Sequence, residues 1–424
     1  MPDPHVKYLL VGGGLASYSA ASAIRARDRQ GALMLVAQEI NRPYYRTPLT
    51  KGFLRREVER SALFTCGPDW YATHAIQLRT GRRASHLDTQ RSVVVLDNGE
   101  AISYDRLLLA TGATPRPLNL PGDRLPNIFS VRTIEDVERL HTAIDKAKAE
   151  GRRHAHGHGR AVIIGGGLLG VELSAGMAAA GLTVDLVVGG AHPWAKFAGE
   201  ATGKFLSHYL ARSGVSVHDG VRAARIEGDG RAQRVILSEG KSLDCDFVVS
   251  AVGAVPNKEL LRGTGVVAEK AILADEHCQT NVAGVFAAGD CAAVRDPLFG
   301  KHRTPEQWDT ALATGTVAGA NMAGEQIALE AVASFTTEVF GLKARAWGQS
   351  KHLHRRLLRG SPNLESPDFL EVGIAADERV SQILAVGHSG DEAVIEELVR
   401  RRIKVNGIDE SLKDPAHPLA NLLV

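Results

Sequence analysis

The fold is decided by two glycine-rich stretches, Val11-Gly12-Gly13-Gly14-Leu15-Ala16-Ser17 and Ile164-Gly165-Gly166-Gly167-Leu168-Leu169-Gly170. In a strand–turn–helix unit, the first glycine permits a tight turn and the second lets a pyrophosphate approach the backbone. A small third residue lets the helix pack closely on the strand, and the helix N-terminus then faces the phosphate charge. The two stretches therefore predict two dinucleotide-binding units.

The segments around each stretch follow the order strand, helix, strand. An apolar run precedes each turn, a helix-forming segment follows it, and a second apolar run closes the unit. These segments are Lys7–Val11, Ala16–Ala26 and Leu33–Ala37 in the first unit, and Ala161–Ile164, a helix through Ala180 and Thr183–Val188 in the second. Only two copies occur, so we interpret them as a duplicated fold rather than a solenoid.

The composition is that of a soluble globular protein with more than one domain. A chain of 424 residues exceeds a single hydrophobic core, and 44% hydrophobic with 23% charged residues is ordinary. A net charge of +2 gives no reason to expect nucleic acid or an anionic membrane as partner. We find no membrane-spanning apolar run, no secretory signal pattern and no metal-ligand spacing. The scattered cysteines favour a reducing cytoplasm over a disulfide framework; they are Cys66, Cys245, Cys278 and Cys291.

The rest of the chain returns to strands and then changes character. Apolar strands are expected at Phe247–Ala251 and Val285–Ala288, before a mostly helical stretch from Pro305 to Gly324. After Phe335, short alternating segments lead to a helix at Glu392–Arg402, which is typical of a small α+β domain. We therefore predict an α/β fold with two Rossmann-like dinucleotide-binding domains and a small α+β C-terminal domain.

The two units differ where the second strand ends. In the first unit, Gln38 and Glu39 follow the strand, and the Glu39 carboxylate is suited to hold an adenosine ribose. In the second, the strand ends in Val188-Gly189-Gly190-Ala191-His192, with neither an acid for a ribose hydroxyl nor an arginine for a 2′-phosphate. Lys196 is close in sequence. Because no cationic cluster marks a phosphate, NADH is favoured and NADPH stays open.

Three further motifs carry a resemblance. The turn Ala110-Thr111-Gly112 and the segment Val285–Asp290 resemble FAD-binding motifs of the glutathione-reductase structural class. Disulfide reductases of that class place a pair of redox cysteines over the flavin, where this chain has Arg42-Pro43-Tyr44-Tyr45-Arg46-Thr47-Pro48-Leu49-Thr50-Lys51. That cysteine-free string resembles the P-Y-x-R-P-P-L-S-K signature of oxygenase-coupled NADH–ferredoxin reductases, rubredoxin reductases and apoptosis-inducing factor. Thr304–Ala311 is similar to a segment of E-H-W type in the same family.

The resemblance implies a domain order and a set of site residues. Residues 1–124 and 247–328 would bind FAD, 125–246 would bind NAD(P), and 329–424 would form the C-terminal domain. The implied catalytic pair is Lys51, near flavin N5, with Glu172 as its partner. The FAD-binding residues would be Gly12, Gly14, Ala16, Ser17, Gln38, Glu39, Arg46, Lys51, Ala84, Ala110, Thr111, Gly112, Gly289, Asp290, Gln307 and Trp308. The NAD(P)-binding residues would be Gly165, Gly167, Leu168, Leu169, Gly170, Glu172, Gly189, Val252, Gly253 and Glu306.

The implied activity is that of an FAD-dependent reductase. Nicotinamide would pass hydride to the flavin, and electrons would leave for an acceptor, with a ferredoxin- or rubredoxin-type iron–sulfur protein favoured. A quinone, a small oxidant or dioxygen is the alternative acceptor. A slow redox-sensing interaction protein, as apoptosis-inducing factor suggests, is the alternative from another class.

The chain also departs from the family pattern. Phe335-Thr336-Thr337-Glu338 stands where the family reads F-W-S-D, and Gln307 replaces the histidine of E-H-W. The basic stretch Lys351–Arg356 is either a docking site for an acidic ferredoxin or a solvated face. The loop with His154, His156 and His158 is interpreted as solvated rather than metal-binding. A homodimer through the C-terminal domain is possible.

Overall fold

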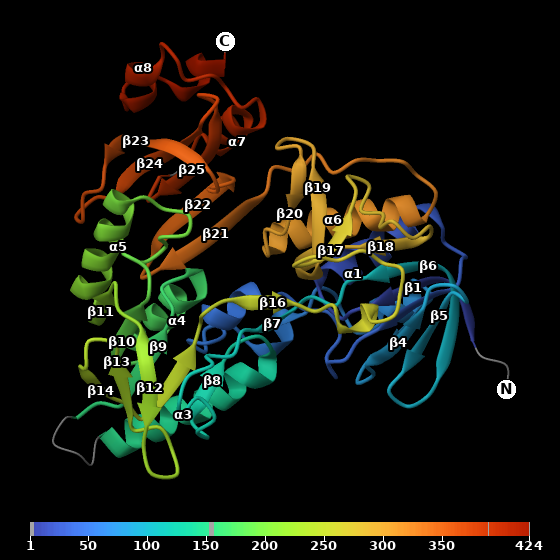
Figure 1. Cartoon of the computed structure of the whole chain (residues 1–424), viewed down its shortest axis with the longest axis horizontal. Helices are drawn as coiled ribbons and strands as arrows, with labels where there is room; N and C mark the ends of the chain where they lie inside the picture. Colours follow the sequence, from blue (N-terminus) through green and yellow to red (C-terminus); the bar gives the residue numbers. More distant parts are fainter. Residues whose placement is uncertain (1–3, 152–156, 389, 424) are drawn as a thin grey trace. The chain divides into compact units, whose positions relative to one another are not determined.

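The computed structural model describes residues 4–151, 157–388 and 390–423 of the chain (Figure 1). It separates into two compact units. The first unit consists of Met1–Arg46, Arg60–Thr114 and Val255–Ala333, and the second of Thr47–Glu59, Pro115–Ala254 and Ser334–Val424. Of the three histidines in the loop after the second unit's first helix, His154 and His156 lie outside the described residues.

The first unit is built on a sheet whose parallel part carries the first glycine turn. Its strands follow the order β3-β2-β1-β6-β5-β4, and β18 also pairs with β6. The pairs β1–β2, β2–β3, β1–β6 and β6–β18 are parallel. The strands are β1 His5–Val11, β2 Leu33–Val36, β3 Ile76–Arg79, β4 Ala84–Asp88, β5 Val93–Leu96, β6 Ala101–Leu109 and β18 Val285–Ala287. Their apolar runs are buried, as expected for a sheet covered on both faces.

Two helices of the first unit pack against each other through small residues. They are α1, Leu15–Arg27, and α6, Trp308–Met322. A Cβ atom at Gly315 or Gly319 of α6 would come within 2.3 Å of a backbone oxygen of α1, that of Ala16 or Ala20. Larger residues would separate the helices, so the alanine-rich first helix is explained by this close contact.

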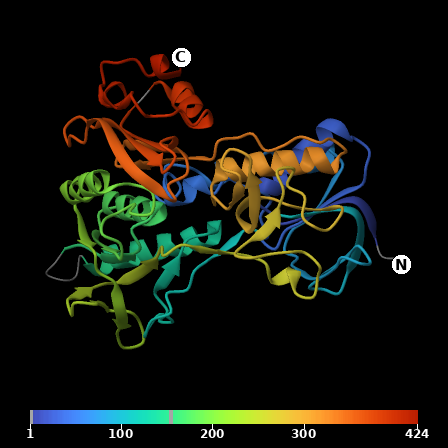
Figure 2. The same cartoon turned by 45° about the horizontal axis from the view of Figure 1, so that its top comes forward.

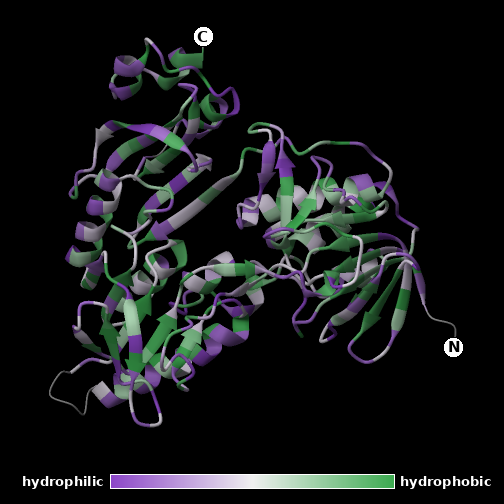
Figure 3. Cartoon of the chain, viewed as in Figure 1, coloured by the Kyte–Doolittle hydropathy of each residue, from purple (hydrophilic) through white to green (hydrophobic). Residues whose placement is uncertain are grey.

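The second unit contains an all-parallel sheet with the order β11-β10-β9-β15-β8. Its strands are β8 Ile128–Ser130, β9 Arg160–Ile164, β10 Thr183–Val188, β11 Val215–Asp219 and β15 Phe247–Ser250, and its helices are α3 Ile134–Gly151, α4 Leu168–Ala179 and α5 Glu200–Arg212. Strands β9 and β10 consist largely of apolar residues, drawn green in Figure 3, and the first three residues of β15 are buried as well. Helix α3 begins with a reciprocal cap, in which Asp136 accepts from the Thr133 backbone and the Thr133 hydroxyl accepts from the Asp136 backbone.

The same unit also holds an antiparallel sheet with the order β21-β22-β25-β24-β23, next to the helices near the C-terminus (Figure 2). Glu371 on β24 caps helix α5, because its carboxylate accepts bonds from the Gly199 backbone nitrogen at 2.8 and 3.0 Å. Gly199 has no side chain with which to cap the helix itself, so the acid from the sheet replaces it. These elements are β21 Ser334–Val339, β22 Leu342–Gly348, β23 Leu353–Ser361, β24 Asp368–Ala375, β25 Val380–Val386, α7 Glu392–Arg400 and α8 Asp409–Lys413.

Short elements complete the chain. They are α2 Trp70–Thr73, β7 Ala113–Pro115, β12 Ala223–Glu227, β13 Arg234–Leu237, β14 Ser242–Asp244, β16 Ala254–Pro256, β17 Ile272–Ala274, β19 Ala292–Asp296 and β20 Lys301–Arg303. No helix in the described ranges combines the length and apolar character that crossing a membrane requires.

The predicted fold class is confirmed, and each of the two sheets carries a glycine turn after a strand in its parallel part. The helix expected at Pro305–Gly324 is shorter, beginning at Trp308 and ending at Met322. One grouping was not foreseen: Thr47–Glu59 belongs to the second unit. The finer domain boundaries stay a prediction.

Candidate dinucleotide sites

The first glycine turn lies between β1 and α1 and is closed by the Ala110–Gly112 turn after β6. Gly12 has a φ of +134°, and a Cβ atom there would be 2.0 Å from the Ala110 oxygen. Gly14 has nothing within 4 Å of an added Cβ. Contact with the Ala110 oxygen therefore requires glycine at position 12, whereas Gly14 leaves open space beside the N-terminus of α1. This space fits a dinucleotide pyrophosphate.

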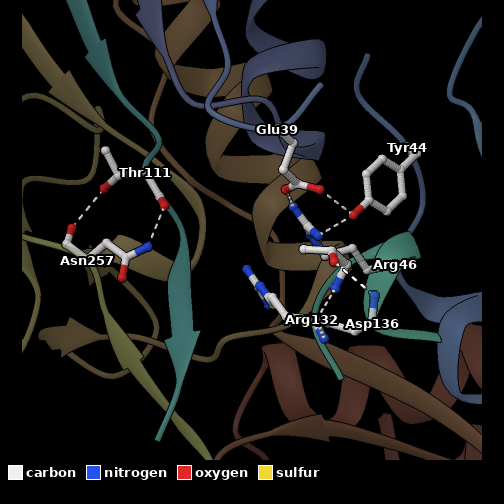
Figure 4. Close-up of polar contacts among 8 residues, drawn as sticks. Glu39, Tyr44, Arg46, Thr111, Arg132, Asp136 and Asn257 are labelled. Carbon is white, nitrogen blue, oxygen red and sulfur yellow. Dashed lines mark hydrogen bonds and ion pairs between the residues drawn. The ribbon is translucent and has the colours of Figure 1, made fainter. Parts of the chain in front are cut away.

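Asn257 fixes the turn after β6 and was missed by sequence reasoning (Figure 4). Its side-chain nitrogen donates to the Thr111 oxygen at 2.9 Å, and its backbone oxygen accepts from the Thr111 hydroxyl at 2.8 Å. Its backbone nitrogen also donates to the Gly112 oxygen at 2.9 Å. Asn257 follows Val255-Pro256, far from the turn in sequence, so no local pattern could have revealed this contact.

Glu39 after β2 is held by two neighbours rather than being free (Figure 4). One carboxylate oxygen accepts from the Tyr44 hydroxyl at 2.6 Å, and the other pairs with Arg46 at 2.5 Å. Burial would lower the pKa of Arg46, but Tyr44 and Glu39 outweigh it and the pKa is raised. The structure therefore brings together two predicted FAD residues, Glu39 and Arg46, and adds Tyr44.

The other residues expected at the FAD site occupy varied positions in the first unit. Ser17 is fully buried, and its hydroxyl has no hydrogen-bond partner within the described structure. The Gly289 backbone nitrogen donates to the Thr314 hydroxyl at 3.0 Å, next to Asp290. Trp308 is 40% exposed at the start of α6. An orphaned buried hydroxyl and an exposed tryptophan are both consistent with a bound group such as FAD.

For three predicted FAD residues, the structure shows no contact that would indicate a role in binding. Ala84 begins β4 and packs against the hydrophobic core of the first unit. Gln38 is exposed beside Glu39, and Gln307 precedes α6 as its N-cap residue without a side-chain cap. Their roles stay predictions.

The second glycine turn repeats the geometry of the first. Gly165 has a φ of +128°, and an added Cβ would be 2.3 Å from the Ala251 oxygen after β15. A Cβ atom at Gly170 would be 1.7 Å from the Gly165 oxygen, so only glycine fits there. Gly167 has nothing within 4 Å of an added Cβ. Helix α4 starts at Leu168, which leaves its N-terminus beside open space.

The ends of the neighbouring strands supply the remaining predicted nicotinamide-site residues. Val252 and Gly253 follow β15, and Gly253 has a φ of +107°. Leu169 is 48% exposed, which is consistent with a surface that a ligand covers. Arg222 lies against Gly189 after β10 and was not foreseen from the sequence. Glu306 belongs to the first unit, so its expected part in this site stays a prediction.

The predicted ion pair between Lys51 and Glu172 is present. The Lys51 Nζ lies 2.7 Å from Glu172 Oε1, and the two side chains are 22% and 6% exposed. Glu172 also accepts hydrogen bonds from the hydroxyls of Thr337, at 2.6 Å, and Thr50. A buried carboxylate is stable only when its oxygens are paired, and here three donors surround it. Thr337 stands where the family string has serine, so the departure from F-W-S-D keeps a hydroxyl at this place.

Two arginines of the basic stretch Lys351–Arg356 form ion pairs within the second unit. Arg355 pairs with Glu378 at 2.6 Å and with Asp409. Arg356 pairs with Glu371 and donates to the Phe197 oxygen at 3.1 Å. These two arginines stabilise the C-terminal sheet, which leaves fewer free cations for docking a partner.

Comparison with known proteins fits this geometry. Residues 6–315 match the family described as pyridine nucleotide-disulphide oxidoreductase. The chain belongs to this family. Its expected nature as an oxidoreductase is thereby confirmed, although no cysteine occurs between Arg42 and Lys51.

Curated relatives match over nearly the whole length. The ferredoxin–NAD(+) reductase subunit of the benzene 1,2-dioxygenase system of Pseudomonas putida is 28% identical over 415 residues, covering 98% of this chain and 97% of the relative. The corresponding component of the biphenyl dioxygenase system of Paraburkholderia xenovorans is 30% identical over 416 residues, with the same coverage of 98% and 97%. The predicted resemblance to oxygenase-coupled ferredoxin reductases is therefore confirmed.

Solved structures extend the match to the fold. The putidaredoxin reductase–putidaredoxin complex includes a chain with a TM-score of 0.89 and 27% identity, covering 99% of this chain and 98% of the other. A ferredoxin reductase from Rhodopseudomonas palustris has a TM-score of 0.90 and 26% identity, covering 99% and 100%. Both are whole-chain matches, so the C-terminal sheet is part of the shared fold.

Proposed function

We propose that the chain is an FAD-dependent NADH reductase whose electron acceptor is a small ferredoxin- or rubredoxin-type iron–sulfur protein. The observation that carries the proposal is the ion pair between the half-buried Lys51 and the buried Glu172. Lys51 ends a cysteine-free segment, and Glu172 lies on the helix that follows the second glycine turn. Relatives named as ferredoxin–NAD(+) reductases support the donor and the acceptor. FAD is assigned to the first glycine turn and the nicotinamide dinucleotide to the second.

FAD would supply the exchange between two-electron hydride transfer and single-electron release. Residues of the chain would hold FAD and the nicotinamide dinucleotide in place for this exchange. Gly14 and Gly167 leave room for the two pyrophosphates, each at a helix N-terminus. Asn257 holds the turn that closes the first site. Glu172 orients the Lys51 ammonium, which on the family resemblance would stabilise negative charge on the reduced flavin.

A place in the reducing cytoplasm is part of the proposal. The four cysteines are all free thiols, and three of them are buried. Thiols of this kind persist in reducing compartments. Homodimer formation stays a prediction.

The test is stopped-flow reduction of the purified protein by NADH, followed by mixing with a panel of acceptors. A yellow protein with bound FAD, fast reduction and fast electron transfer to a ferredoxin or rubredoxin are expected. Preferential electron transfer to a quinone or dioxygen would show that the acceptor is not an iron–sulfur protein. Slow turnover with a long-lived charge-transfer band, coupled to a change in oligomeric state, would favour the sensor. A colourless protein that binds no FAD would reject the whole assignment.

A further inference from the structure

The second unit lacks the acid that normally selects NADH. In dinucleotide-binding units, a carboxylate about 20 residues past the glycine turn binds the 2′-hydroxyl of the adenosine ribose. The same carboxylate repels the 2′-phosphate of NADPH. Here β10 ends at Val188, which is buried, and Gly189 and Gly190 follow. None of these three residues has a carboxylate, so the usual barrier against NADPH is absent.

An arginine from a later part of the chain lies beside this position. The loop after β11 is bound to the end of β10 by the Val221 nitrogen, 3.1 Å from the Val188 oxygen, and the Gly220 nitrogen, 2.8 Å from the Gly190 oxygen. The next residue, Arg222, is fixed on its other side, since its oxygen accepts from Ser238 at 2.8 Å. Its side-chain stem runs along Gly189, where an added Cβ would be 3.3 Å from Arg222 Cγ.

The guanidinium of Arg222 is not committed to another group. It is exposed, and the described residues offer it no ion pair. Two arginines on the adjoining hairpin are different, because Arg225 and Arg234 both pair with Glu227. The acid at the end of β11, Asp219, accepts a bond from the Ser207 hydroxyl at 2.7 Å. A fixed backbone with an unpaired, planar cation is a good arrangement for binding a phosphate.

We propose that the enzyme accepts NADPH as well as NADH, and that Arg222 binds the 2′-phosphate of NADPH. The inference rests on the proposed function for the hydride donor. It goes beyond that function by naming a second donor and the residue that admits it.

The experiment measures dissociation constants of NADP+ and NAD+ for the purified protein, and flavin reduction by NADPH and NADH. In the unmodified protein the two dinucleotides should bind within about tenfold of each other, equivalent to about 1.4 kcal/mol. Arg222→Ala should weaken the binding of NADP+ about tenfold to a hundredfold, the range expected for the loss of a hydrogen bond to a charged group. The dissociation constant of NAD+ should stay within about twofold of its original value. Arg222→Lys should retain part of the NADP+ affinity.

Two further variants complete the design. Gly189→Glu restores an acid at the strand end and should abolish NADPH use while keeping NADH. Arg225→Ala is the matched control on the same hairpin and should leave the dissociation constants of both dinucleotides unchanged. Thermal unfolding of each variant checks that the second unit is intact.

The outcomes separate the inference from the proposed function. A preference for NAD+ above about a hundredfold in the unmodified protein, or equal loss of both dinucleotides in Arg222→Ala, overturns the role of Arg222. If the protein binds both dinucleotides but neither reduces a bound flavin, the proposed reductase function fails and the assignment of Arg222 stands.

Discussion

The two glycine turns share one geometry and differ in what surrounds it. In each, the first glycine, Gly12 or Gly165, is required by the carbonyl oxygen of a residue just after another strand. The third glycine of each run, Gly14 or Gly167, faces open space. Outside this shared core, the first turn is followed by Glu39, which is tied to Arg46 and Tyr44. The second is followed by Gly189 and an arginine. Both turns therefore offer the same site for a pyrophosphate, and the choice of dinucleotide depends on the residues that follow the second strand of each unit.

A second difference lies on the helices themselves. The position that Glu172 occupies after the second turn corresponds to Ser19 after the first. The Ser19 hydroxyl donates within its own helix, to the Leu15 oxygen at 2.9 Å. Glu172 instead reaches out to Lys51, Thr50 and Thr337. Of these two corresponding positions, only Glu172 forms an ion pair with a side chain from a distant segment.

The largest expected effect comes from the shared core. Gly12→Ala or Gly165→Ala would place a Cβ 2.0 or 2.3 Å from a backbone oxygen. Overpacking and positive φ should together lower the free energy of unfolding of the affected unit by about 3 kcal/mol or more. Denaturant unfolding measures this. Gly14→Ala is the control and should change stability by less than about 1 kcal/mol. If all three variants were equally stable, the carbonyl contacts would not constrain the turns.

The next prediction separates the ligands. Gly14→Val and Gly167→Val fill the open space beside a helix N-terminus without meeting protein atoms at the Cβ. Gly14→Val should abolish FAD retention, and Gly167→Val should weaken the nicotinamide dinucleotide more than about a hundredfold while FAD stays bound. The FAD content of purified protein and titration with NAD+ measure the two effects. Loss of FAD in Gly167→Val, with retention in Gly14→Val, would show that the assignment is reversed.

The parts predictable from sequence are those carried by local patterns. The glycine spacing after an apolar run predicted both turns, and the resemblance of the Pro43–Lys51 string to the family signature predicted the role of Lys51. The rest depends on contacts that join distant segments: Thr111 and Asn257 are 146 residues apart, and Glu172 and Thr337 are 165 apart. Arg222 was missed for the same reason, since the loop after β11 returns to the end of β10 only in the folded chain. No pattern in a single sequence encodes such a return.

The third prediction concerns Lys51, the charged partner of Glu172 on the helix after the second turn. Lys51→Ala should lower the flavin midpoint potential or slow reduction by NADH about tenfold or more, because a cation stabilises the reduced flavin's negative charge. Redox titration and stopped-flow reduction measure the two quantities. Arg56→Ala is a matched control on the same segment, where Arg56 pairs with Asp145 on α3 at 2.6 Å. Unchanged potential and rate in Lys51→Ala would remove the assigned role.

The smallest expected effect tests how Glu172 is held. Thr337→Val removes one hydroxyl donor from a buried carboxylate, which should lower the free energy of unfolding by about 1–3 kcal/mol. It should also shift the flavin potential in the same direction as Lys51→Ala but by less, because Lys51 and Thr50 still contact Glu172. Thr337→Ser, which keeps the hydroxyl, should restore both values. Thr336→Val is the control, since Thr336 is exposed on the neighbouring position of β21. If Thr337→Val changes stability but leaves the potential at the control value, Thr337 stabilises the fold and does not position the Lys51–Glu172 pair.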